Sequence, residues 1–181
     1  PENLMSIGNS AFYDCNELTS IEFSDNLKTI GDLAFSDCDN LIEINFSNKL
    51  NSLGRYAFSN CYSLTTLVLP ERLTDISESA FSGCYSLESV EFSDKLTSIG
   101  EYAFFDSTSL TSIIIGDGVT SIGLSAFSLT GYYNDSSNWE NGVLYIGNHL
   151  IKADTEILDT YSIKPGTKTI ATQAFKYCEI L

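Results

Sequence analysis

The chain repeats one short pattern, Ile-Gly-x-x-Ala-Phe-x-x-Cys-x-x-Leu, in constant register. Ala-Phe pairs recur every 23 residues, at Ala11-Phe12, Ala34-Phe35, Ala57-Phe58, Ala80-Phe81, Ala103-Phe104 and Ala126-Phe127. A seventh pair, Ala174-Phe175, follows after 48 residues. An aliphatic residue stands four positions before every Ala, and Ile170 holds that position before the last pair. A fixed period in this range is typical of a solenoid, in which each unit buries its apolar face only against its neighbours.

Each unit has room for two extended sides and one tight or helical corner. Around Ile44 and Phe46 the apolar residues alternate with Glu43 and Asn45, which predicts a half-buried strand. Turn residues such as Ser47-Asn48-Lys49 follow the strand in every unit. Helix-pair repeats need about 33 to 47 residues, and β-helix repeats need multiples of about six or nine. The 23-residue period therefore favours equivalent strands stacked in parallel.

The segment Leu18-x-x-Ile21-x-Phe23 resembles the leucine-rich repeat pattern. With Leu27-x-x-Ile30-Gly-x-x-Ala34-Phe35-x-x-Cys38 it resembles the BspA-type leucine-rich repeats, which occur on surface proteins of bacteria and some protists. The fold expected is an α/β repeat solenoid: a right-handed coil with parallel strands, about 23 residues per coil, and short helical or 3-10 corners. Asn26 is the only asparagine at the position where ordinary leucine-rich repeats keep one, so the usual asparagine ladder is absent and the sequence does not determine the curvature of the solenoid.

We expect a single elongated domain over residues 1–181, with an insertion at about residues 128–160. The chain begins and ends inside a repeat, and Leu181 stands where another strand would open. A fragment of a longer array is therefore expected, and the absence of a signal peptide says nothing about secretion.

Cysteines hold the same place in most units. Cys15, Cys38, Cys61 and Cys84 stand 23 residues apart, and Cys178 keeps their phase. Stacked strands bring such thiols near disulfide distance, but side chains of parallel coils point the same way. The bunched spacing of zinc ligands is missing. We expect buried free thiols that act as small apolar side chains.

No catalytic, metal or cofactor motif stands out in the sequence. The only histidine, His149, lies in a predicted hairpin turn between Val143–Ile146 and Leu150–Lys152, and we expect a structural role for it. Gly116-Asp117-Gly118 occupies the recurring turn position and is interpreted as a turn, not a calcium loop. We expect no enzyme; a carbohydrate-active alternative requires two carboxyl groups about 5 to 9.5 Å apart in a pocket.

The chain is strongly acidic, with a net charge of −15. Such a charge repels phosphate backbones and anionic lipids, so we expect no nucleic-acid partner. No apolar run approaches the roughly 20 residues of a membrane span, so membrane insertion is not expected either.

Two candidate binding surfaces follow from the repeat and its interruption. The first is the outward row of the predicted strands, formed by Glu22, Asn45, Val68, Glu91 and Ile114. The second is the aromatic insertion with Tyr132, Tyr133 and Trp139. The favoured interpretation is that these rings close the coil edge exposed by the interruption, and the alternative is a carbohydrate or protein contact.

The function expected is a monomeric, extracellular cell-surface scaffold for adhesion or protein recognition. Its partner would be a host or cell-surface protein or a glycan. The alternatives are a passive spacer stalk that presents another domain and a carbohydrate-active protein that uses the insertion.

Overall fold

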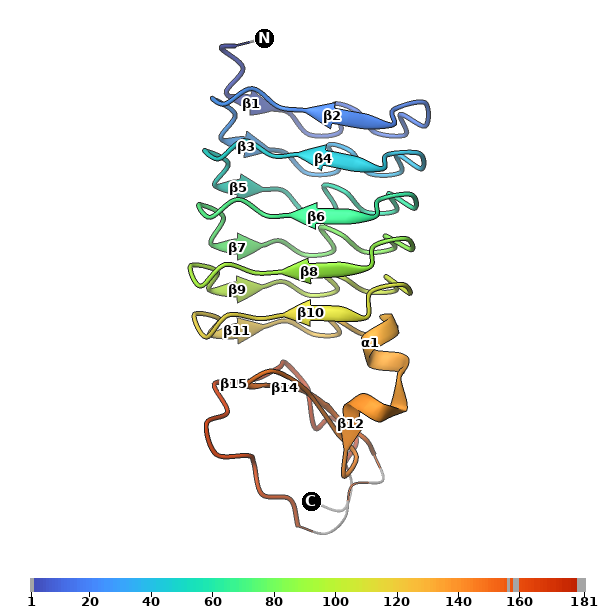
Figure 1. Ribbon diagram of the computed structural model, residues 1–181, viewed down its shortest axis with the longest axis vertical. Coiled ribbons are helices and arrows are strands. Elements are labelled where there is room, and N and C mark those ends of the chain that lie inside the picture. Colours follow the sequence, from blue (N-terminus) through green and yellow to red (C-terminus); the bar gives the residue numbers. More distant parts are fainter. Residues whose placement is uncertain (1, 156, 158–159, 179–181) are drawn as a thin grey trace.

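The computed structural model describes residues 2–155, 157 and 160–178. These residues wind into a straight β-solenoid of about seven turns, with the N-terminal coil at one end and the insertion at the other (Figure 1). The parallel coils confirm the predicted solenoid and its 23-residue period. Leu181, expected to open a further strand, lies outside the described residues.

Two-residue strands form the first side of the solenoid. They pair in parallel with their neighbours, so Ile7 lies opposite Ile30 and Ile76 lies opposite Ile99. The second residue of each strand is buried, because successive strand residues point to opposite faces. These strands are β1 (Ser6–Ile7), β3 (Thr29–Ile30), β5 (Ser52–Leu53), β7 (Asp75–Ile76), β9 (Ser98–Ile99) and β11 (Ser121–Ile122).

Three-residue strands form the second side. Their middle residue points into the solenoid and the two flanking residues point outward, as the alternating sequence predicts. Strand β2 pairs with β4, and β6, β8 and β10 form a continuous parallel sheet. These strands are β2 (Ser20–Glu22), β4 (Glu43–Asn45), β6 (Thr66–Val68), β8 (Ser89–Glu91) and β10 (Ser112–Ile114).

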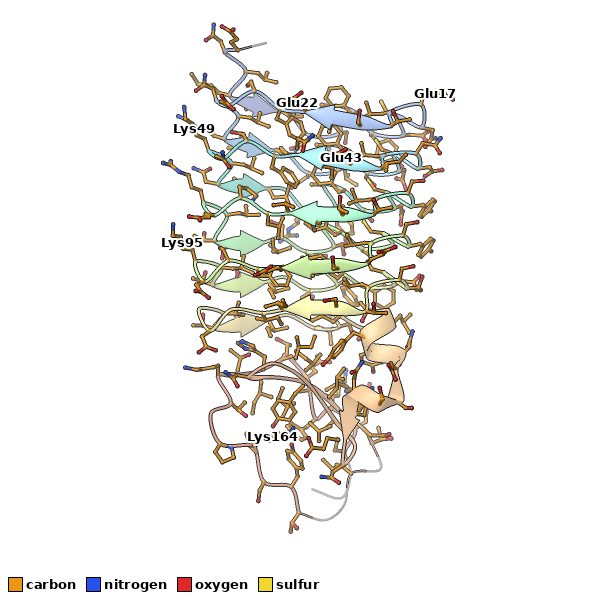
Figure 2. All side chains as sticks on the ribbon, in the orientation of Figure 1. Glu17, Glu22, Glu43, Lys49, Lys95 and Lys164 are labelled. Carbon is orange, nitrogen blue, oxygen red and sulfur yellow. The ribbon has the colours of Figure 1, made fainter. Side chains whose placement is uncertain are left out.

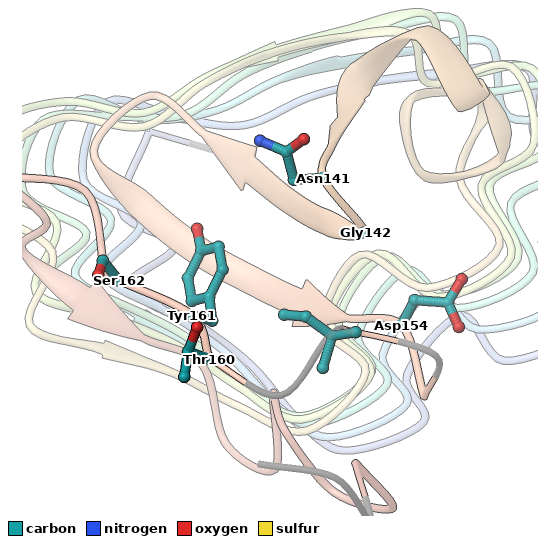
Figure 3. A pocket seen from close by; sticks show the side chains of 7 residues that line it. Asn141, Gly142, Asp154, Thr160, Tyr161 and Ser162 are labelled. Atoms are coloured by element: carbon teal, nitrogen blue, oxygen red, sulfur yellow. The ribbon is translucent and has the colours of Figure 1, made fainter.

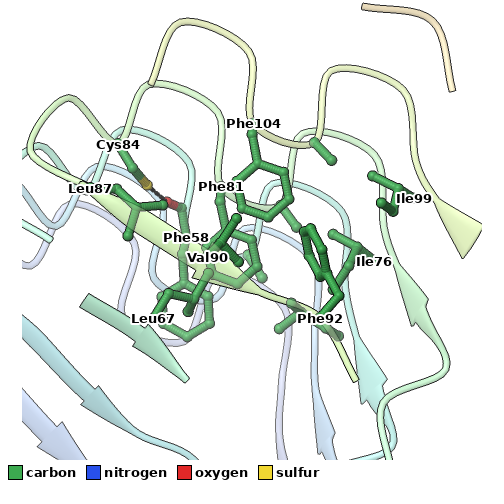
Figure 4. Close-up of a cluster of buried hydrophobic side chains, with 14 of the residues drawn as sticks. Phe58, Leu67, Ile76, Phe81, Cys84, Leu87, Val90, Phe92, Ile99 and Phe104 are labelled. Carbon is green, nitrogen blue, oxygen red and sulfur yellow. Dashed lines mark hydrogen bonds between the residues drawn. The ribbon is translucent and has the colours of Figure 1, made fainter. Parts of the chain in front are cut away.

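A column of phenylalanine rings runs through the core. Phe35 and Phe58 stack with ring centroids 5.0 Å apart and an interplanar angle of 2°, and Phe58 stacks on Phe81 at 5.7 Å. Phe81 in turn stacks on Phe104 at 5.5 Å, and Figure 4 shows these rings beside Leu87 and other apolar side chains. Each ring belongs to the Ala-Phe pair of its coil, so the repeat spacing itself builds the stack.

The Ala-Phe corners are turns, which corrects the expectation of helical or 3-10 corners. In each corner the residue before Ala and the residue three positions after it have positive φ, as at Leu33 (φ 57°) and Asp37 (φ 60°). A right-handed helix cannot pass through left-handed residues. The corner N–H groups also donate to the next coil, as Phe35 N does to Ala57 O at 2.8 Å, so they are unavailable for helical bonds within the chain segment.

The insertion supplies the helical residues that the structure describes. Helix α1 (Gly131–Asn134) and the 3-10 helix η1 (Ser136–Asn138) lead into a sheet of β12 (Trp139–Glu140), β13 (Val143–Ile146), β14 (His149–Ala153) and β15 (Thr169–Ile170). The predicted hairpin is confirmed, because β13 and β14 pair in antiparallel fashion across Gly147 and Asn148. The described residues therefore form a β-solenoid, and the α/β assignment overstates the helical content.

The last coil departs from the phase of the others. In β15 the hydroxyl residue Thr169 is buried, whereas Ile170 is 45% exposed. Its partner strand is β14 of the insertion, and the Thr169 side chain turns inward to meet His149. The position of Ile170 in the repeat predicts that its side chain is buried in the solenoid, and this prediction is wrong. The reason is that β15 pairs with β14 of the insertion and not with a strand of a regular coil.

Candidate functional site

The outward side of the second strand row is the first candidate surface, here called the strand face. The structure places all five residues of the predicted row on it, and all are exposed: Glu22, Asn45, Val68, Glu91 and Ile114. Pairing sets Glu22 opposite Asn45, and sets Glu91 between Val68 and Ile114. One side chain per coil thus repeats along the solenoid axis at strand spacing.

Two apolar side chains interrupt the polar character of the strand face. Val68 is 79% exposed and Ile114 is 54% exposed, although both belong to strands whose middle residues are buried. Single exposed apolar residues are ordinary on protein surfaces. Here they stand in line with carboxylates on a rigid sheet, which gives the face both apolar and acidic contacts.

A shallow groove crosses the strand face between β4 and β6. Its cavity volume is about 360 Å³, and its lining includes Glu43, Asn45, Thr66, Val68 and Glu71. The Asn45 amide donates a hydrogen bond to Glu43 Oε1 at 3.3 Å. Glu22 and Glu43 lie on neighbouring coils of this side, while Glu17 lies at the outer end of its coil (Figure 2). The groove offers hydrogen-bond acceptors and an apolar wall, and these features suit the binding of a partner.

The aromatic residues of the insertion are half-buried against the core. The Trp139 indole N–H donates to Tyr133 O at 2.8 Å, and the two rings meet edge to face with centroids 5.3 Å apart. The Tyr132 hydroxyl donates to Tyr145 O at 3.1 Å. Burial raises the pKa of both Tyr132 and Tyr133. These contacts close the coil edge, so only the outer parts of the rings remain for a partner.

An exposed tyrosine pair at the outer corner was not predicted from the sequence. Tyr62 and Tyr85 follow the cysteines of successive coils and stack with centroids 5.0 Å apart and an interplanar angle of 4°. Burial raises the pKa of both hydroxyls, and nearby Asp39 and Asp106 act in the same direction. The sequence signal for this pair is the spacing of the two tyrosines, which stand 23 residues, one repeat period, apart.

The cysteine column is free of disulfides, as expected: Cys15, Cys38, Cys61, Cys84 and Cys178 are free thiols. Three of these are fully buried, and burial raises the pKa of Cys38 to about 11 and of Cys84 to about 12. Cys15 and Cys178 are half-buried, so the expected burial fails in the first and the last coil.

The buried thiols are more than apolar fillers, because each S–H donates to the Phe carbonyl of the preceding coil. Cys84 Sγ lies 3.4 Å from Phe58 O, and Ser107, one coil later, makes the equivalent bond to Phe81 O at 3.1 Å. Figure 4 shows the Cys84 contact. The column therefore requires a small hydrogen-bond donor, which explains why serine replaces cysteine within it.

His149 is fully buried between the array and the last coil. Its Nδ1 lies 2.8 Å from Thr169 Oγ1, and its Nε2 has no hydrogen-bond partner in the part of the chain that the structure describes. Burial lowers the pKa of the imidazole. No group of three or more His, Cys, Asp or Glu side chains among the described residues could hold a metal ion. The histidine lies at an internal seam, away from the strand face.

A further hollow of about 510 Å³ opens beside the hairpin (Figure 3). Its lining includes Asn141, Asp154, Thr160 and Tyr161. Burial raises the pKa of Tyr161, whose hydroxyl donates to the Tyr145 hydroxyl at 3.2 Å.

In the described part of the chain, no helix is long and apolar enough to cross a membrane.

The repeat pattern matches the model of a known family. The BspA type leucine rich repeat region matches in 6 copies over residues 1–84 and 51–181. The chain belongs to the BspA-type leucine-rich repeat family. A search of curated proteins finds no match. The family assignment thus confirms the resemblance seen in the Leu, Ile, Ala-Phe and Cys positions.

Solved structures share this solenoid fold. A leucine-rich repeat protein of T. pallidum is 30% identical, with a TM-score of 0.68, over 70% of this chain and 59% of its own length. A leucine-rich cell surface protein of Faecalibacterium prausnitzii is 26% identical, with a TM-score of 0.69, over 98% of this chain and 41% of its own length.

The pneumococcal vaccine antigen PcpA, at 23% identity, shares the fold with a TM-score of 0.60 over 97% of this chain and 41% of its own. The chain therefore spans between about two fifths and three fifths of the length of these relatives.

Proposed function

We propose that this array is a cell-surface binding scaffold that mediates adhesion or protein recognition through the strand face. The observation that carries the proposal is the row in which exposed Val68 and Ile114 flank Glu91. Membership of the BspA-type family and similarity to a leucine-rich cell surface protein support the location.

The strand face suits a partner that has apolar side chains and a basic rim. Glu22, Glu43 and Glu91 supply carboxylates, and the whole chain carries a net charge of −15. Opposite charge accelerates encounter, while apolar contacts at the centre hold the complex. The strands are fixed by inter-coil hydrogen bonds, so binding orders few groups and loses little conformational entropy. A monomer with a protein or glycan partner on another cell fits this arrangement.

The test is adhesion of beads coated with the purified chain to cultured epithelial cells. The variant Glu22→Lys/Glu91→Lys reverses the charge of the strand face, and Val68→Asp/Ile114→Asp removes its apolar contacts. Both changes lie on exposed side chains and leave the buried positions intact. We expect each double variant to lose most of the adhesion of the parent chain.

A matched control carries the same charge change elsewhere. Glu17→Lys/Glu101→Lys alters two exposed carboxylates at the corners, outside the strand face. We expect this control to adhere as the parent does. If the parent and both face variants adhere equally, the strand face is not the binding surface.

The spacer alternative rests on the straight stack of equivalent coils, which holds its two ends a fixed distance apart (Figure 1). A spacer binds nothing by itself, so uncoated beads and coated beads would then adhere equally.

The carbohydrate alternative rests on the insertion and requires the exposed parts of its rings. A glycan array probed with the parent and with Trp139→Ala separates it, since only a glycan site at the insertion loses signal in that variant.

A further inference from the structure

A regular set of hydrogen bonds joins the corners of neighbouring coils. Ser10, Phe12 and Asp14 donate their N–H groups to carbonyl oxygens of the second coil. The equivalent three bonds recur at each of the next four junctions, with N···O distances of 2.8 to 3.0 Å. At the fifth junction the donors are Tyr102, Phe104 and Asp106, and the acceptors are Leu124, Ala126 and Ser128. In every regular coil these donors therefore point toward the next coil.

The sixth coil breaks this rule. The equivalent donors are the N–H groups of Ser125, Phe127 and Leu129, and none has an acceptor among the residues that the structure describes. Phe127 is fully buried. Buried backbone N–H groups without a partner are rare in native proteins, so the Phe127 N–H requires an explanation. Ser125 is half-buried and Leu129 is exposed, so water reaches these two residues.

The insertion removes the acceptors that the sixth coil would otherwise reach. Ala153 N donates to Ala174 O at 2.9 Å, so the insertion and not the sixth coil occupies the carbonyl of the last corner. Strand β14 pairs with β13 along one edge and with β15 along the other. Both edges of β14 are thus used, and it offers no row of carbonyls to the sixth coil.

A cavity of about 130 Å³ lies beside this corner. It is bounded by the corner itself, by Tyr133 and β14 of the insertion, and by the start of the last coil. Its polar lining residues are Ser125, Ser128, Tyr133, Lys152, Thr172 and Gln173. Lys152 is the only charged residue in the lining, and its ammonium donates to Gln173 O at 3.3 Å. Lys152 thus brings one positive charge to the lining of this seam.

We propose that the seam between the sixth coil and the insertion binds a small oxyanion, such as inorganic phosphate. The Ser125 N–H, which lines the cavity and has no acceptor among the described residues, can donate to an anion, and a lysine ammonium adds a charge-assisted hydrogen bond. The hydroxyls of Ser125, Ser128 and Thr172 supply further donors, and no carboxylate lines the cavity to repel the ligand. The cavity exceeds the roughly 30 Å³ that one water occupies in the liquid, so a tetrahedral oxyanion fits. This site is independent of the strand face.

The experiment is a titration of the full chain with sodium phosphate, followed by amide resonances in nitrogen–proton correlation spectra. Sodium chloride at the same ionic strength is the reference. We expect the largest saturable shift at Ser125, which lines the cavity, and smaller shifts at Phe127 and Leu129, which adjoin it, over a millimolar range. The amides of Tyr102, Phe104 and Asp106, which occupy the same repeat positions but have acceptors, serve as internal controls and remain unmoved.

Lysine variants test the charge. Lys152→Met is expected to weaken phosphate binding by about tenfold, whereas Lys152→Arg retains it, because a charge-assisted bond is stronger than a neutral one. Lys49→Met, which removes an exposed lysine of the array that donates to Asn26, is the matched control and keeps the parent affinity. The dispersion of the spectrum shows whether each variant is folded. The proposal is overturned if the Ser125 amide shows no saturable shift with phosphate, or if folded Lys152→Met binds phosphate as tightly as the parent.

Discussion

The regular coils and the insertion hold together in different ways. In the coils, a group finds its partner about 23 residues away, and the same contact recurs in the next coil, as in the stacked Phe58, Phe81 and Phe104 rings. In the insertion, contacts are single and local: Trp139 bonds to Tyr133, six residues earlier. Stability in the array is therefore shared among equivalent interfaces, whereas the insertion depends on individual side chains.

Thiol reactivity is expected to separate the two regions most strongly. Burial raises the pKa of Cys84 to about 12 from 9.0, which leaves about a thousandfold less thiolate near pH 8. Cys38, Cys61 and Cys84 should therefore resist alkylation in the native protein, while half-buried Cys178 reacts. Mass spectrometry of peptides after timed alkylation measures each rate. Rapid labelling of Cys61 in the folded chain would show that the coils open readily.

Removing a core ring tests the shared interfaces. Phe81→Ala should lower the free energy of unfolding by about 3 to 5 kcal/mol, since Phe81 is fully buried between two rings. Phe175→Ala in the last coil should cost less, because that ring is half-buried. Urea denaturation measures both values. Equal losses would contradict the view that the array and the last coil are packed differently.

The insertion should respond locally to the loss of its tryptophan. Trp139→Ala removes one hydrogen bond and a half-buried ring, and we expect a loss of about 2 kcal/mol, below the range for a fully buried aromatic. Amide hydrogen exchange should accelerate in the insertion and the last coil and remain unchanged near Phe35. Uniform acceleration along the chain would mean that the two regions unfold as one.

The donor column offers a smaller test within the array. Cys84→Ser keeps a donor to Phe58 O, as Ser107 does naturally for Phe81 O, whereas Cys84→Ala leaves that carbonyl without it. We expect Ser to be more stable than Ala by about 1 kcal/mol. Thermal unfolding of both variants measures the difference, and a more stable Ala variant would show that only packing matters at this position.

The pH dependence of the seam is the smallest effect expected. Burial lowers the pKa of His149 below its ordinary value of 6.5, so the unfolded chain binds the proton more readily than the folded one. The stability that the neutral imidazole provides is complete above pH 6.5 and is lost as the pH falls toward the lowered pKa. Unfolding measured between pH 8 and 5 should show this loss, and His149→Gln should abolish that part of the pH dependence.

The sequence predicts the solenoid, its period and its buried positions because every coil places the same residue type at the same point. It does not predict the corner conformation. Residues such as Leu33 and Tyr56, which rarely adopt positive φ, do so because inter-coil hydrogen bonds impose it. The expectation of helical corners treated each corner as an isolated segment, and that assumption is wrong.

The two candidate surfaces also differ in how far the sequence predicts them. Exposure of Val68 and Ile114 follows from strand alternation and is read from the sequence directly. The half-burial of Trp139 and the outward position of Ile170 depend on contacts that occur once in the described chain, so no repeated sequence pattern predicts them. The binding role of either surface stays a prediction.

The backbone N–H groups of the residue before each corner Ala, of the Phe and of the residue two positions after the Phe all donate in one direction, from each coil to the next. The peptide units that make them are therefore aligned along the solenoid axis, and each carries a dipole of about 3.5 D. Aligned dipoles add, as they do in an α-helix, with the positive end toward the insertion. The corner edge of this solenoid is thus electrically polarised along its length, and an additional regular coil inserted in register would extend that polarisation as well as the surface.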